Sequence, residues 1–117
     1  MATFSKSALS GSTNGRPIKV VATATAGTLI HTAVSGTTNF DEVWIYATND
    51  NASAVDLTIE WGGVTDPDDL IQMSIPSKSG LYLIAPGLVL QNSLVIRAFA
   101  GTANVITITG FVNNIVP

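Results

Sequence analysis

Carboxylates gather at one place in this chain, where Asp66, Asp68 and Asp69 follow Glu60 within ten positions. Several acids on one loop offer the oxygen ligands that Ca²⁺ prefers, although an EF-hand loop also needs a central Gly and a distal Glu that are missing here. The other interpretation is a solvated turn, in which Pro67 fixes φ and an Asp side chain caps backbone amides. We expect the turn, with no metal and no cofactor, and keep calcium as the alternative.

His31 is the one histidine, and the chain has no Cys. A lone His without thiolates cannot anchor a conventional zinc site. A Ser/His/Asp triad is formally possible, but there is no G-x-S-x-G elbow to mark a nucleophile. Because His31 sits within an apolar strand pattern, we expect a hydrogen-bonded packing residue. We therefore predict no catalytic residues and no enzymatic activity.

Four aromatic side chains have the chemistry to stack on sugars: Trp44, Tyr46, Trp61 and Tyr82. Trp61 would end a strand beside Gly62-Gly63, where a ring can be presented to solvent. The alternative is packing in the core or at an interface, where aromatic residues contribute most of their area. We expect packing and keep carbohydrate binding as the alternative.

Composition restricts the classes of protein further. The 117 residues correspond to one domain, and only 11% of them are charged, against about 25% in a typical soluble domain. The net charge of −3 and five scattered cations argue against direct nucleic-acid binding. No apolar run is long enough for a membrane helix or a secretory leader. With 46% hydrophobic residues, the chain is expected to hide part of its surface against other subunits.

Short runs rich in Val, Ile, Leu and Thr alternate with turn residues about every ten positions. The pattern predicts an all-β fold, a single antiparallel, jelly-roll-like sandwich of about eight strands. The run from Asp41 to Thr48 is apolar on both faces, with Val43 and Ile45 on one and Trp44 and Tyr46 on the other. Such a strand is normally covered on both sides. The expected strands are 18–23, 28–34, 41–48, 55–61, 70–75, 81–85, 94–99 and 105–112.

Residues 1–16 differ in composition from residues 17–117, which we assign to the sandwich domain. They are small, polar and Gly-punctuated, and we expect a flexible N-terminal arm, with strands beginning after Pro17. Phe4 and Leu9 are the large apolar side chains of the arm. They would either dock on a neighbouring molecule or belong to a frayed terminus.

Several segments, taken together, resemble small virion proteins of tailed bacteriophages, and the nearest group is the capsid decoration (cement) proteins. The similarity is one of overall pattern over nearly the whole chain, with no catalytic motif in it. The segments that carry it are Gly11–Val20, Gly27–Ala33, Asp41–Ala47, Leu57–Gly63 and Ala98–Asn104.

The resemblance implies a β-rich body, often trimeric, that is made in the host bacterial cytoplasm and sits on the capsid exterior. Its partners would be the major capsid protein and further copies of itself, and its role would be to hold the shell together. We expect Trp44 or Tyr46 at the trimer interface. The expected capsid-binding residues are Phe4, Lys6, Leu9 and Arg16.

Related phage proteins also serve as head fibres or tail components. The competing hypothesis is therefore a carbohydrate-binding adhesion module of a head fibre or tail. A decoration protein needs contacts at its arm and base, whereas an adhesion module needs an exposed aromatic concavity.

Overall fold

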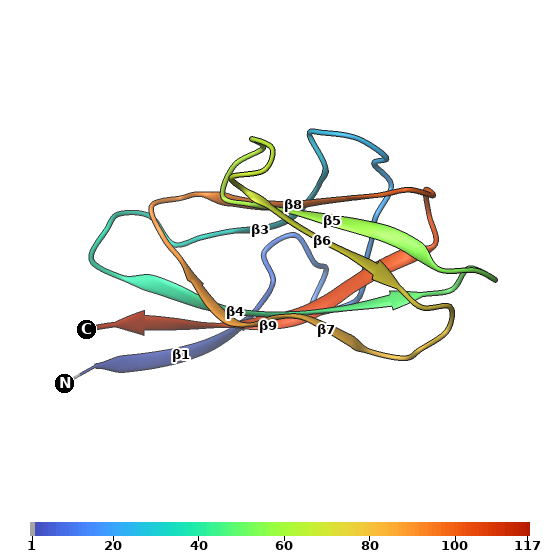
Figure 1. The fold of residues 1–117 in the computed structure, drawn as a ribbon. Helices are drawn as coiled ribbons and strands as arrows, with labels where there is room; N and C mark the ends of the chain where they lie inside the picture. Colours follow the sequence, from blue (N-terminus) through green and yellow to red (C-terminus); the bar gives the residue numbers. More distant parts are fainter. Residues whose placement is uncertain (1) are drawn as a thin grey trace.

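The computed structural model describes residues 2–117, which form nine strands in two antiparallel sheets packed face to face (Figure 1). The five-stranded sheet contains β1 (Thr3–Ala8), β2 (Ile18–Lys19), β4 (Phe40–Asn49), β7 (Tyr82–Leu90) and β9 (Ile106–Val116). The four-stranded sheet contains β3 (Thr28–Thr32), β5 (Val55–Trp61), β6 (Leu70–Ile75) and β8 (Val95–Ala100). The prediction of an all-β sandwich is confirmed. Among these residues there is no helix that is long and apolar enough to cross a membrane.

The pairing of the strands follows the jelly-roll pattern. β2 pairs with β9, β3 with β8, β4 with β7 and β5 with β6, so the chain from β2 to β9 is one long hairpin. The hairpin wraps on itself through the further pairs β4–β9 and β5–β8. This wrapping brings the middle of the chain and its C-terminal strand into one sheet.

The core lies between the two sheets, and the period-2 alternation of the strands builds it. In β4 every second residue is buried, including Val43 and Ile45, and the residues between them face outward. In β9 the buried residues include Ile106 and Ile108. The opposing layer contributes a matching set from β3, β5, β6 and β8: Ile30, Leu57, Ile59, Ile75 and Ile96.

Two strand boundaries differ from the prediction for backbone reasons. The expected strand at 81–85 continues through Pro86 and Gly87 to Leu90 as β7. Pro is tolerated there because β7 is an edge strand, and its pairing with β4 shifts register twice around that point. The expected strand at 18–23 is reduced to the two residues of β2.

The expectation that strands begin after Pro17 is wrong. Residues Thr3–Ala8 form β1, which pairs in register with the end of β9, from Thr3 opposite Val116 to Ala8 opposite Phe111. All six residues are exposed, so the pairing buries no apolar side chain of β1 and gives no apolar pattern to detect. β1 and the end of β9 lie side by side at one end of the molecule (Figure 1). Met1, the first residue of the expected arm, lies outside the described residues.

Leu9 also requires a correction. It was expected to be a free anchor on the arm, but its side chain is only 2% exposed and belongs to the core. The backbone around it is held by Gly11, whose N–H donates to the Ile30 carbonyl at 2.9 Å. An apolar side chain at the end of a polar segment is buried here because β1 ends where the sandwich body begins.

Candidate functional site

The outward side of the five-stranded sheet carries most of the partly exposed aromatic side chains. Register places three rows of residues across it, since directly opposed residues of antiparallel strands share a face. We call this surface the aromatic face. The rows are Phe4–Ile115–Phe40, Lys6–Asn113–Glu42 and Ala8–Phe111–Trp44, and Tyr46 continues the face along β4.

At the centre of the aromatic face, a cation and two rings form a stack. The Lys6 ammonium lies 4.3 Å from the centroid of the Phe111 ring. Phe111 stacks on Trp44, with centroids 6.0 Å apart and planes inclined by 11°. An aromatic pair contributes about 0.5–1.5 kcal/mol beyond its buried area, and an exposed cation–π contact about 0.5–1 kcal/mol. The stack therefore joins β1, β9 and β4 across the outer surface.

Glu42 holds the Trp44 ring in its orientation. The Trp44 indole N–H donates to Glu42 Oε1 at 3.0 Å, and the Asn113 amide donates to the same oxygen at 2.9 Å. These hydrogen bonds, first that from Asn113 and then that from Trp44, lower the pKa of Glu42 below its usual value. The carboxylate is consequently ionised at neutral pH and accepts both bonds.

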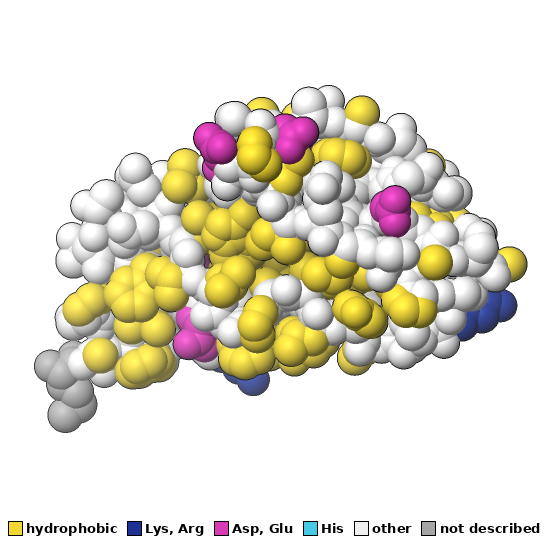
Figure 2. All heavy atoms as spheres, viewed as in Figure 1, with side chains coloured by type: hydrophobic (Ala, Val, Ile, Leu, Met, Phe, Trp, Pro, Cys, Tyr) yellow, Lys and Arg dark blue, Asp and Glu magenta, His cyan; other side chains and the backbone are white. Residues whose placement is uncertain are grey.

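The edge strand β7 extends the aromatic face with apolar residues. Leu83 lies opposite Tyr46, Pro86 opposite Trp44 and Val89 opposite Glu42, and all three are exposed. Gly87 leaves room for the indole: a Cβ there would lie 3.1 Å from two carbon atoms of the Trp44 ring. Hydrophobic side chains are visible along this side of the molecule in Figure 2. The aromatic face is thus a broad apolar surface with two charged groups on it.

The structure brings together four of the six residues predicted to make contacts. Phe4, Lys6, Trp44 and Tyr46, selected for two different roles, all lie on the aromatic face. Phe4 lies at the outer end of the aromatic face and is 66% exposed. Leu9 lies in the core instead, as described above.

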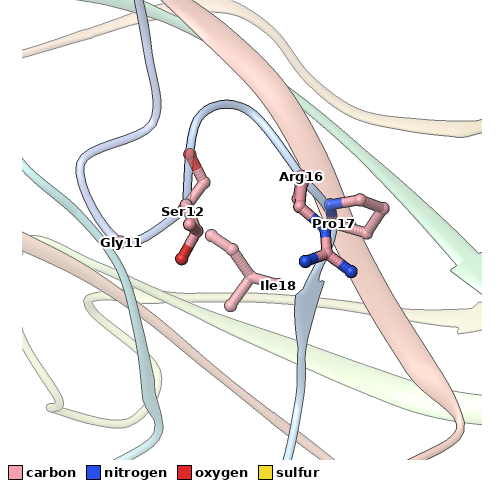
Figure 3. A pocket seen from close by; sticks show the side chains of 6 residues that line it. Gly11, Ser12, Arg16, Pro17 and Ile18 are labelled. Carbon is pink, nitrogen blue, oxygen red and sulfur yellow. The ribbon is translucent and has the colours of Figure 1, made fainter.

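Arg16 is exposed in the loop between β1 and β2. It lines a shallow hollow of that loop together with Gly11, Ser12, Pro17 and Ile18 (Figure 3). Among residues 2–117, no other charged side chain lines this hollow.

His31 is buried and hydrogen-bonded, as expected. Its Nε2 lies 2.8 Å from Asp41 Oδ2, and its Nδ1 accepts the backbone N–H of Ser10 at 3.0 Å. Nδ1 must be unprotonated to accept that bond, so the ring proton is on Nε2. The Nε2–H group donates a hydrogen bond to Asp41 Oδ2. Ser10 contributes its backbone N–H here, while its hydroxyl accepts the N–H of Thr32. The arrangement joins the segment after β1 to β3 and β4.

Two of the carboxylates that lie close together in the sequence, Glu60 and Asp69, accept hydrogen bonds from different parts of the fold. Glu60 is fully buried, and it accepts hydrogen bonds from the Gly27 N–H at 2.6 Å and from the Thr25 hydroxyl. It thereby fixes the β2–β3 connection over the outside of the four-stranded sheet. Asp69 accepts the Thr65 N–H at 3.1 Å within its own turn. Across residues 2–117, no three His, Asp or Glu side chains lie close enough together to hold a metal ion.

Sequence reasoning missed Phe40, Phe111 and Ile115, which complete the aromatic face. The expected last strand ended at Val112, whereas β9 runs to Val116. Extending the alternation of Thr107 and Thr109 by three further positions would have placed Phe111, Asn113 and Ile115 on the same side. Trp61, one of the four aromatic residues behind the carbohydrate alternative, packs against the core.

Comparison with protein-family models, with curated protein sequences and with solved structures finds no match for the chain.

Proposed function

We propose that the chain is a structural protein of a phage virion, a capsid decoration protein that binds the major capsid protein and stabilises the shell. The observation that carries the proposal is the aromatic face, because an apolar surface of this kind on a small domain is typical of a protein-binding surface. The sequence resemblance to decoration proteins supplies the identity of the partner. This role requires no catalytic chemistry, so it does not depend on His31 or on the carboxylates described above.

Two parts of the aromatic face would make two different contacts, one with further copies of the chain and one with the capsid protein. Trp44 and Tyr46 lie near its centre, beside Leu83 of β7, and would pack against further copies in a trimer. Phe4 lies on β1 toward the projecting end, Lys6 lies further along β1 over Phe111, and both would contact the capsid protein. Aromatic anchors surrounded by less buried contacts are the usual source of binding energy at protein interfaces.

The test is binding to heads of the parent phage that lack the protein. Wild-type protein should co-sediment with the heads and occupy defined positions in an electron cryomicroscopy map. Phe4→Ser should weaken binding about fivefold or more, since a buried aromatic anchor contributes more than about 1 kcal/mol. Val21→Ser is the matched control, because Val21 is also exposed but lies outside the aromatic face.

Failure of the wild-type protein to bind heads at tens of micromolar would refute the proposal. A glycan array separates the competing adhesion role. Binding to a glycan that is lost in Trp44→Ala would favour a head-fibre or tail module over a decoration protein.

A further inference from the structure

We propose that the free edge of β6 pairs with β6 of a second copy, so that two four-stranded sheets join into one across a two-fold axis. The inference is independent of the proposed function, because β6 belongs to the other sheet from the aromatic face. It rests on the state of the four sheet edges, on the alternation of β6 and on the charges at its two ends.

Three of the four sheet edges are blocked against a further strand. β7 contains Pro86 and two register shifts. β3 has a register shift of its own, and Gly11 and Ser10 already bond its outer side, at the Ile30 carbonyl and the Thr32 N–H. The remaining edge consists of β1 and β2, which carry Lys6 and Lys19 and are separated by a loop. Lysine, proline and bulges are the devices by which proteins prevent edge pairing.

β6 has none of these devices. Its six residues, LIQMSI, include no charge and no Pro, and its register with β5 is regular from Leu70 to Ile75. The Trp61 N–H donates to the Asp69 carbonyl at 2.8 Å, which makes this a hydrogen-bonded pair. Since such pairs alternate along an antiparallel ladder, Ile71 and Met73 bond to β5, and the backbone groups of Gln72 and Ser74 point to the free edge.

The side chains of β6 match the surface that an added strand would meet. Ile71 and Met73 are partly buried and pack against the core, whereas Gln72 and Ser74 are exposed on the outer face. Figure 2 shows hydrophobic side chains between the two layers on this side of the molecule. A strand added here therefore needs apolar residues toward that seam and polar residues outward. β6 itself has this pattern, which makes the edge complementary to a second copy.

The charged residues at the two ends of β6 also favour a second copy of the chain as the strand that pairs with this edge. In an antiparallel β6–β6 pair, the start of one strand lies beside the end of the other. Asp66 and Asp68 are exposed just before β6, where acidic side chains stand over the loop in Figure 2, and Lys78 is exposed just after it. None of these three forms an ion pair within residues 2–117. The two-fold axis would bring the acidic loop of each copy to the Lys78 of its partner, twice per dimer.

The first experiment is a charge exchange followed by analytical ultracentrifugation. Lys78→Glu should weaken the dimerisation step about tenfold, because two attractive contacts become repulsive and an exposed pair is worth up to about 1 kcal/mol. Asp68→Lys combined with Lys78→Glu should restore it. Lys19→Glu makes the same change in net charge on the other sheet and should have no effect.

The second experiment is hydrogen exchange of the wild-type protein as a function of its concentration. The amides of Gln72 and Ser74 should become protected as the dimer forms, while exposed amides elsewhere should not. Gln72→Pro should remove the dimer and leave the fold intact, because that N–H is not used by β5; Gln72→Thr keeps the N–H and should retain the dimer. Rapid exchange of both amides at all concentrations, or charge variants that sediment like the wild type, would overturn the proposal.

Discussion

Glu42 is the residue that orients the Trp44 ring, so its ionisation controls the centre of the aromatic face. Hydrogen bonds from Asn113 and Trp44 lower its pKa in the folded protein below the ordinary value of 4.5. A lowered pKa means that the carboxylate stabilises the fold above the unfolded-state value. That contribution is lost as the pH falls through the folded-state pKa. The Trp44 orientation should therefore persist at neutral pH and be lost only when the pH falls below the ordinary pKa of a glutamate.

This prediction is checked by following the Trp44 indole N–H resonance between pH 7 and pH 2.5 in a Trp61→Phe background. The resonance should titrate with a midpoint below 4.5, the ordinary value. Glu42→Gln keeps an acceptor oxygen but cannot ionise, so its indole resonance should not move over this range. A wild-type midpoint at or above the ordinary value would show that the two hydrogen bonds are not maintained in solution.

At the scale of secondary-structure elements, β1 and Leu9 make opposite contributions although they are adjacent. The six side chains of β1 are exposed, whereas Leu9 fills part of the core. Leu9→Ala should lower the free energy of unfolding by about 2–4 kcal/mol, as expected for truncating a buried leucine. Phe4→Ala in β1 should change it by less than about 0.5 kcal/mol. Urea unfolding of the two variants measures both values.

A further comparison separates the element from its anchor. A chain that lacks residues 2–8 should fold and retain most of its stability, because only one side of β1 is paired and none of it is buried. Extending the deletion to Leu9 should add the core cost. Equal stability of the two truncated chains would mean that the Leu9 side chain does not occupy the core position.

The extent to which the strands could be predicted follows from how each is stabilised. β4 and β5 have buried faces, and their alternation located them within one residue of the observed boundaries. β1 forms through backbone pairing with β9 and the contact of Lys6 with Phe111, and the residues TFSKSA contain no apolar alternation that would reveal it. β7 continues past Pro86 because its outer edge is unpaired, a property of the sheet order and not of the local sequence.

The same distinction applies to the candidate site. Trp44 and Tyr46 could be selected from the sequence because they make the second face of one strand apolar, where polar residues are usual. That Lys6 lies over Phe111, and Phe111 on Trp44, depends on the registers of β1 and β4 with β9. Such registers join residues that are 57 positions apart (Asn49 and Ile106) to 113 positions apart (Thr3 and Val116) in the chain. No local pattern encodes them. The stack therefore became visible only in three dimensions.

At the scale of the whole molecule, the two proposals assign different surfaces to different contacts. The molecule is elongated, with extents of 48 × 27 × 21 Å, and the aromatic face and the β6 edge belong to different sheets. The residues that form one surface take no part in the other. A protein with both can join neighbours in two directions, which is the property that a shell-stabilising component needs.

The use of the aromatic face in self-association is tested by two leucines of equal exposure. Leu83 is 43% exposed on the aromatic face, and Leu94 is 42% exposed outside it, immediately before β8. Leu83→Asn should weaken trimer formation at micromolar concentration about tenfold, since the side chain would leave a desolvated contact that is worth more than about 1 kcal/mol. Leu94→Asn should sediment like the wild type. Because both variants remove the same apolar group at the same exposure, equal behaviour of the two would exclude the aromatic face as the trimer interface, whatever the state of the β6 edge.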